Sequence, residues 1–299
     1  MSSFADRLDW NLLHTFMIVV QERSMTRASL RLHKTQSAIS QAIARLEDSV
    51  GVKLLHRSRT GLSPTPAGKR LLDQAQLVFT TISRMPIALE ETSEAVSGKI
   101  KIVMIDSIVC PDFDASLTNF FSIYPEVELE ISIDTTSSVI NAVELGACTC
   151  GISDGVIPEK FKSKEILRES FALFCCGAHR LAGMRDISDS DLRDEPFVGF
   201  TADVLGGAHM GDVTAFRAKA SIGQHVRGLS SYVSEVRRMI ECGLGIGFLP
   251  LHLAEPHLSD GKLWRLPMLD EVPQAPVYLF SNPSVTLSQA EQLFLQKIS

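Results

Sequence analysis

Apolar residues recur at helical spacing through the first 66 positions of the chain. Residues 8–22 form one such segment, and a second follows Ser24, which is a favourable helix N-cap. After a polar turn at 33–35, a third helix is predicted over 36–50. One face of this third helix is apolar, with Ile39, Ala42, Ile43, Leu46 and Val50. Two short helices joined by a tight turn predict a helix-turn-helix.

The opposite face of the 36–50 helix carries small or amide side chains and one arginine. Such side chains can approach base edges in the major groove, whereas a solvated helical hairpin is the alternative interpretation. A basic, turn-rich segment at about 52–65 favours DNA binding, because a wing of this kind can touch phosphates or the minor groove. The candidate DNA-binding residues are Gln36, Ser37, Ser40, Gln41, Arg45, Arg57 and Arg59.

A longer helical pattern begins at Ala67. Its apolar positions, separated alternately by four and three residues, are Leu71, Ala75, Val78, Ile82, Met85 and Leu89. This a/d spacing predicts a dimerisation helix, and an amphipathic helix lying on its own domain is the alternative. We favour dimerisation, because little sequence remains in the first 66 residues to cover the stripe. Pro86 is expected to kink or end the helix nearby.

From residue 98 the pattern alternates between strands and helices. Strands are expected at 100–105, 127–133, 148–153, 166–176, 197–200, 221–226, 245–249, 263–266 and 277–280. Helices are expected at 111–124, 136–145, 229–242, 286–297 and just after Pro250. This order predicts an α/β fold with a largely parallel sheet covered by helices. Two such units, joined by crossing segments near 160 and 268, would form two lobes with a hinge.

Charge is distributed unevenly between the two parts of the chain. The 299 residues have a net charge of −6, yet the first 66 hold nine Lys/Arg and five Asp/Glu, a net of +4, so the remainder has a net of −10. A basic head on an acidic body suits DNA binding by the head alone. The first residues show no signal-peptide pattern, and no apolar run is long enough to span a membrane, so a cytoplasmic location is expected.

Short motifs along the whole chain resemble one family of regulators. In the first third they are Gln36-Ser37-Ala38-Ile39-Ser40, Leu46-Glu47, Gly51, Leu54-Leu55, Arg57 and Ala67-Gly68. In the remainder they are the segments 98–102, 124–125 and 243–250. Together they resemble the LysR-type transcriptional regulators. Departures from the family pattern are Ser29 for Ala, Leu55 for Phe, Pro64 for Leu, and Thr149 for Asp in the 146–152 element.

The resemblance implies a winged helix-turn-helix head at 1–66, a coiled-coil linker helix at 67–97 and an effector domain at 98–299. The last would have a type 2 periplasmic-binding-protein-like fold, with lobe I at 98–160 and 269–299 and lobe II at 161–268. It also implies base contacts from the 36–41 positions and binding to double-stranded DNA at an inverted-repeat operator. Homodimers or homotetramers, a small-molecule effector and contact with RNA polymerase are the other partners implied, without a cofactor or catalysis.

Ligands of two-lobed α/β proteins bind between the lobes, at the carboxyl ends of strands. Hydroxyls and helix N-termini there suit a small carboxylate, with Arg227 as a counter-charge. Asp106, if it points inward, instead favours an amine-bearing ligand such as an amino acid, and both classes stay open. Each hydroxyl could equally be a helix cap. The candidate effector-binding residues are Asp106, Ser107, Thr136, Phe200, Thr201, Arg227 and Ser230.

Other classes of protein find little support. Gly243, Gly245 and Gly247 precede a strand, the reverse of a dinucleotide-binding fingerprint. The six cysteines are interpreted as buried thiols. The alternative functions are a thiol-based redox sensor and, with less support, an enzyme. No metal site, Ser-His-Asp arrangement or HExxH motif is readable. A free-standing solute-binding protein is disfavoured by the helix-turn-helix pattern.

Overall fold

The computed structural model describes residues 8–58, 61–89, 96–201, 211–267 and 273–298. The chain divides into two compact units, residues 1–89 and 90–299, which are described separately below. The boundary falls inside the 67–97 linker expected from the sequence, and the long helix of that linker belongs to the first unit. No helix in the described ranges is both long and apolar enough to cross a bilayer.

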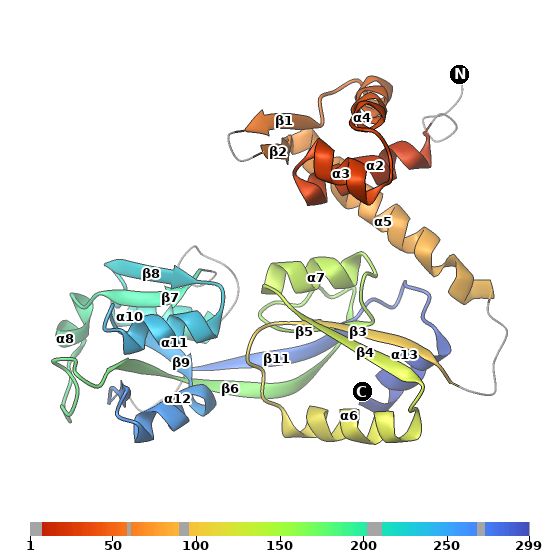
Figure 1. The fold of residues 1–299 in the computed structure, drawn as a ribbon. Coiled ribbons are helices and arrows are strands. Elements are labelled where there is room, and N and C mark those ends of the chain that lie inside the picture. The colour runs from red at the N-terminus through yellow and green to blue at the C-terminus, as the bar shows by residue number, and fades with distance from the viewer. Residues whose placement is uncertain (1–7, 59–60, 90–95, 202–210, 268–272, 299) are drawn as a thin grey trace. The chain divides into compact units, whose positions relative to one another are not determined.

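The first unit is a helical head with a two-stranded hairpin (Figure 1). Its elements are α2 (Trp10–Glu22), α3 (Met25–Arg31), α4 (Gln36–Val50), β1 (Leu55–Ser58), β2 (Gly61–Pro64) and α5 (Pro66–Leu89). The side chains of Ser24 and Thr35 accept backbone N–H groups and cap α3 and α4. Phe16, Ile39 and Leu46 are fully buried where the three helices meet, so the apolar face expected for 36–50 is the face that packs.

The second unit consists of two lobes that share one sheet. Lobe I contains β3 (Gly98–Met104), α6 (Pro111–Ile123), β4 (Val127–Ile133), α7 (Thr136–Glu144), β5 (Cys150–Asp154), β11 (Gln274–Ser281) and α13 (Gln289–Ile298). Lobe II contains α8 (Asp189–Arg193), β7 (Phe197–Phe200), α10 (Gly211–Lys219), β8 (Val226–Ser230), α11 (Val233–Glu241), β9 (Gly247–Pro250), α12 (Leu251–Ser259) and β10 (Leu263–Arg265). The long strand β6 (Lys162–Cys176) runs through both.

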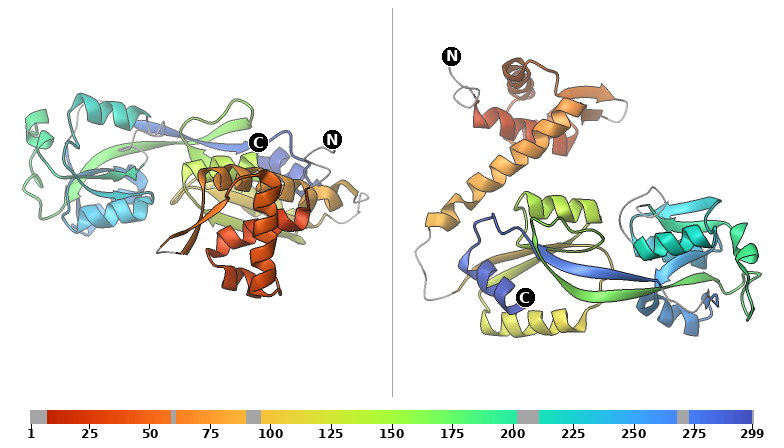
Figure 2. Two further views of the ribbon diagram at one scale, coloured as in Figure 1. Left: turned by 90° about the horizontal axis from the view of Figure 1, so that it is seen from above. Right: turned by 180° about the vertical axis from the view of Figure 1, so that it is seen from behind.

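The sheet order is β10-β6-β11-β5-β3-β4, with β9 also paired to β6 and a separate β7-β8 pair. Seen from behind, β6 and β11 lie side by side as the antiparallel connection between the lobes (Figure 2). The strand β6 begins close to 160, where one crossing segment was expected, whereas position 268, expected for the other, lies outside the described residues and β11 begins at Gln274. In lobe I, α6 and α13 cover one face of the sheet and α7 covers the other (Figure 1). In lobe II, α11 and α12 pack on one face and α8 and α10 on the opposite one.

One predicted strand is wrong and two helices were not predicted. Residues 220–225 form a turn, and the strand expected at 221–226 starts only at Val226 and runs to Ser230. Ile222 is buried, which explains the apolar pattern, but Gly223 has a φ of +86° and breaks an extended run. Helix α10 was missed because Val213 is its only fully buried side chain, and α8 because it has only five residues.

The departure at Thr149 has a structural partner. The Thr149 hydroxyl donates to the carboxylate of Glu291 at 2.8 Å and accepts the N–H of Lys101 at 3.1 Å. The second Glu291 oxygen accepts the N–H of Ser288 at 2.8 Å, and both Thr149 and Glu291 are buried. The carboxylate that the family pattern places at this position is thus supplied here by α13. This bond ties α13 to the start of β5, an interior strand of the sheet.

Candidate functional site

The polar face of α4 is exposed on the surface of the first unit. Thr35 caps the helix, its hydroxyl accepting the N–H of Ala38 at 3.2 Å and lying 3.0 Å from the Ser37 hydroxyl. The five candidate side chains of this face are all exposed, namely Gln36, Ser37, Ser40, Gln41 and Arg45. Since the other face fills the head core, α4 can enter a groove without disturbing the packing behind it.

The hairpin after α4 is formed as expected. Its strands pair antiparallel, and Pro64 lies opposite Leu55 at the open end of the ladder, where a missing N–H costs little. The backbone of Arg57 lies in β1, opposite Leu62. The side chain of Arg57 and the whole of Arg59 lie outside the described residues.

Glu47 holds the hairpin against α4, a role not predicted from the sequence. Its buried carboxylate accepts from Lys53 Nζ at 2.5 Å and from the Leu54 N–H at 2.9 Å, with the Leu55 N–H at 3.4 Å. Burial alone would raise the pKa of Glu47, but these hydrogen bonds outweigh it and hold the pKa below its usual value. The end of α4 and the start of β1 are therefore held together by one charged group.

Replacing Glu47 with alanine is expected to lower the free energy of unfolding of the head by about 2–3 kcal/mol at neutral pH, the cost of losing hydrogen bonds to a charged group. Because the folded-state pKa is lowered, this stabilisation is present above pH 4.5 and is lost as the pH falls through the folded-state value. Denaturant unfolding at several pH values measures it. Asp48→Ala, at the exposed neighbouring position, is the control, and equal losses in both variants would contradict this role.

The apolar stripe of α5 divides into two parts. Leu71 and Ala75 pack into the core of the head, and Ala75 is only 1% exposed. For these two positions the dimerisation prediction needs correction, because the head itself covers them. Val78, Ile82 and Met85 are 43%, 37% and 54% exposed. The side chain of Leu89 lies outside the described residues. The surface that a second chain could cover therefore starts at Val78, and Pro86 lies inside the last turn of the helix.

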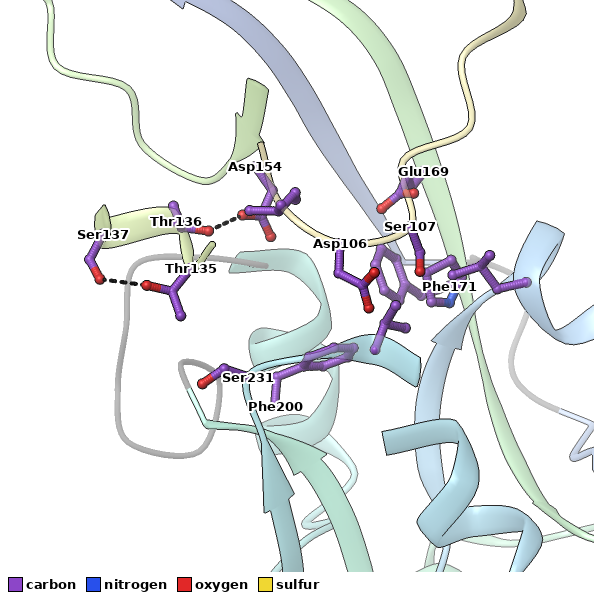
Figure 3. Close-up of a pocket in the computed structure, with 14 residues that line it drawn as sticks. Asp106, Ser107, Thr135, Thr136, Ser137, Asp154, Glu169, Phe171, Phe200 and Ser231 are labelled. Atoms are coloured by element: carbon purple, nitrogen blue, oxygen red, sulfur yellow. Dashed lines mark hydrogen bonds between the residues drawn. The ribbon is translucent and has the colours of Figure 1, made fainter. Parts of the chain in front are cut away.

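In the second unit, a cavity of about 120 Å³ lies between the lobes, at the carboxyl ends of their strands (Figure 3). Asp106 and Ser107 follow β3, and Thr136 begins α7. Phe200, at the end of β7, forms part of the opposite wall. Four of the predicted effector residues therefore line one cavity. The remaining lining residues are Ile105, Thr135, Ser137, Asp154, Glu169, Phe171, Ser231, Val233, Pro250 and Leu253.

Three predicted effector residues do not line this cavity. Arg227 is exposed, and its Nη1 atom lies 3.5 Å from the carbonyl oxygen of Leu244, which it can donate to. The sequence had placed this residue after a strand, whereas it lies within β8. Ser230 ends β8, where its hydroxyl accepts the N–H of Tyr232 at 3.1 Å, and the next residue, Ser231, lines the cavity instead. Thr201 follows Phe200 but is not among the lining residues.

Two carboxylates of the cavity were missed. Asp154 ends β5 and accepts the Thr136 hydroxyl at 2.7 Å (Figure 3). Its place at the end of a buried strand was a usable signal, the same one that indicated Asp106. Glu169 lies in the middle of β6 and had no such signal. Burial, together with the charge of Asp154, raises the pKa of Glu169 to about 7.

The cysteines give the redox alternative no specific support. Cys110, Cys148, Cys150 and Cys175 are buried, Cys176 is half-buried and Cys242 is exposed. Burial raises the pKa of Cys150, and burial with nearby charges raises that of Cys175 to about 12. Thiols with raised pKa values are poor nucleophiles near neutral pH, since the thiolate is the reactive form.

Comparison with known proteins agrees with this geometry. Residues 10–69 match the family model of the bacterial regulatory helix-turn-helix protein, lysR family, and residues 93–299 match that of the LysR substrate binding domain. An uncharacterised HTH-type transcriptional regulator of Bacillus subtilis, YwbI, is 29% identical over 89% of this chain and 87% of its own. These matches cover both units.

Two solved structures have the same fold. The LysR family transcriptional regulator CbnR in complex with its target DNA aligns with a TM-score of 0.63 at 17% identity, over 97% of this chain and 99% of its own. A full-length cysteine-to-aspartate variant of OxyR from Pseudomonas aeruginosa aligns with a TM-score of 0.59 at 20% identity. The alignment covers 97% of this chain and 93% of the OxyR chain.

A winged helix-turn-helix followed by a two-lobed α/β unit with a cleft between its lobes defines a transcriptional regulator with an effector-binding domain. Its family follows from the two model matches, which together cover most of the chain: the protein belongs to the LysR-type transcriptional regulators. The head is accordingly its DNA-binding domain and the second unit its effector domain.

Proposed function

We propose that the protein binds an inverted-repeat operator as a dimer, with α4 of each head in the major groove. The observation that carries this proposal is the fully exposed polar face of α4, backed by an apolar face in the head core. Gln36, Ser37, Ser40 and Gln41 would read bases, while Arg45, one turn further on, and the wing arginines would contact phosphates.

Dimerisation through the exposed part of α5 would present two heads to successive major grooves. A small molecule in the cleft between the lobes would control the regulator, and Asp106, Ser107, Thr136 and Phe200 are its proposed contacts. Further pairing of effector domains into a tetramer, and contact with RNA polymerase, extend the same proposal.

Two substitutions on α4 test the division between base and phosphate contacts. Gln41→Ala is expected to cost about 1–3 kcal/mol on the operator and little on random DNA, because an amide read against a base edge is specific. Arg45→Ala should weaken binding to all sequences alike and reduce the slope of affinity against salt. Fluorescence anisotropy over a salt series measures both. Equal losses on operator and random DNA for Gln41→Ala would remove it from the base-reading set.

A further inference from the structure

The wall of the effector cleft is acidic. Three of its lining residues are carboxylates, Asp106, Asp154 and Glu169. None of the cavity's described lining residues is a lysine, an arginine or a histidine. Arg227, the counter-charge expected from the sequence, lies outside the cavity. Above the pKa of Glu169, which is about 7, a bound carboxylate would therefore meet three groups of its own charge and no described opposing charge in the wall.

The N-terminus of α11, one of the helix N-termini at the cavity, already faces a carboxylate of the chain itself. The Oδ2 atom of Asp106, in lobe I, lies 3.5 Å from the backbone nitrogen of Ser234, in the first turn of α11 in lobe II. This carboxylate occupies the place where the partial positive charge of α11 would attract an acidic ligand. The chain's own side chain thus stands where the carboxylate of an organic acid would bind.

Glu169 indicates that the cleft suits a positively charged group, which its own lining residues do not supply. The residue is only 7% exposed, its carboxylate faces the cavity (Figure 3), and no hydrogen bond from the described residues satisfies it. The nearest basic atom is His252 Nε2 at 3.7 Å, and this atom lies closer, at 3.4 Å, to the carbonyl oxygen of Ser107. A largely buried carboxylate whose oxygens are open only to a cavity is poorly solvated, and a ligand ammonium group would supply both donors and charge.

The arrangement suits an organic cation better than a metal ion. The described residues contain no group of three His, Cys, Asp or Glu side chains placed to hold a metal. Phe171, Phe200 and Leu253 give the same cavity apolar wall against which methylene groups can pack.

We propose that the effector of this regulator is a small organic cation, with an ammonium group bound by Glu169 and Asp154. The proposal rests on the function proposed above, in that the cleft between the lobes is taken as the effector site. The sequence left two classes of effector open, a small carboxylate and an amine-bearing ligand, and this proposal favours the amine-bearing ligand.

Three four-carbon probes that differ in charge test it, namely 1,4-diaminobutane, 4-aminobutanoate and succinate. Calorimetric titration of the full chain at pH 8 and 0.15 M salt is expected to show affinity falling in that order. Glu169→Gln should weaken diamine binding about tenfold, the effect of about 1.4 kcal/mol. Glu165→Gln is the matched control, because Glu165 lies on the same strand but is exposed and paired with Arg168 at 2.7 Å.

Affinity for the diamine should also fall as the pH drops below 7, because Glu169 then takes up a proton, and this dependence should disappear in Glu169→Gln. The charged or titratable groups that face Glu169 are Asp154 from β5, Asp106 from the loop after β3 and His252 from α12. A His252→Gln variant that keeps the pH dependence assigns it to Glu169; a variant that loses it removes this support from the proposal.

Tighter binding of succinate than of the diamine, or no binding of any probe at millimolar concentration, would overturn the cation assignment. If succinate binds and Thr136→Val abolishes that binding, the cleft remains the effector site and only its charge preference is wrong. Diamine binding that is indifferent to both Glu169→Gln and Thr136→Val would instead place the ligand elsewhere and remove the effector site proposed above.

Discussion

Replacing Ile82 with glutamate is expected to separate the chains of the proposed dimer. Operator binding should weaken about tenfold to a hundredfold, which corresponds to about 1.4–2.8 kcal/mol. Ile82 lies between Val78 and Met85 on the exposed part of the α5 stripe. In a paired seam, both copies of the new carboxylate would be buried against apolar side chains without a partner. Sedimentation velocity, followed by anisotropy on the operator, measures the two effects.

Ser83→Glu is the matched control for this variant. It adds the same charge to the same helix at an exposed position, about 100° away from Ile82 around the helix axis. The control is expected to keep the dimer. An unchanged assembly for Ile82→Glu would show that the exposed part of α5 is not the interface.

Replacing Glu169 with glutamine is expected to raise the free energy of unfolding of the effector domain by about 1–3 kcal/mol at pH 8. Burial raises the folded-state pKa of Glu169 to about 7, above its unfolded value of 4.5. Between these values the folded protein holds a proton that the unfolded chain has released, so the unfolding free energy falls as the pH rises. Glutamine, always neutral, removes that dependence.

Denaturant unfolding at pH 5 and pH 8 measures this gain, which should be small at pH 5 and full at pH 8. Glu165→Gln, at an exposed position of the same strand, should change little at either pH. A gain of equal size at both pH values would show that Glu169 is not held neutral by its surroundings. A variant that is more stable yet binds the diamine less well would show stability given up for a binding charge.

The amino-acid pattern predicted the elements best where burial alone decides them. The helix 36–50 and the strands 127–133 and 197–200 have the bounds expected from the sequence. The strand at 221–226 failed because Ile222 packs into the lobe from a turn, and periodicity cannot distinguish a buried turn residue from a strand residue. The division of the α5 stripe also lay beyond the pattern, since it depends on which part the head covers.

The residues of the cleft could also be predicted from the sequence only in part. Ser107, Thr136 and Asp106 were found because they follow a strand or begin a helix, which places them at one edge of a parallel sheet. Glu169 reaches that edge only because β6 continues from one lobe into the other, and its position in the middle of a strand gives no local signal. The sign of the site's charge therefore depended on a long-range feature of the topology.

Lobe I is assembled from two stretches separated by the whole of lobe II, and this has a consequence during synthesis on the ribosome. The strand β5 needs β11 as its neighbour, and Thr149 needs Glu291, which lies 142 residues further along the chain. The head, whose contacts are local, can fold while the rest is being translated, but lobe I stays incomplete until α13 has emerged. A nascent chain of this regulator would acquire its DNA-binding domain well before the domain that controls it.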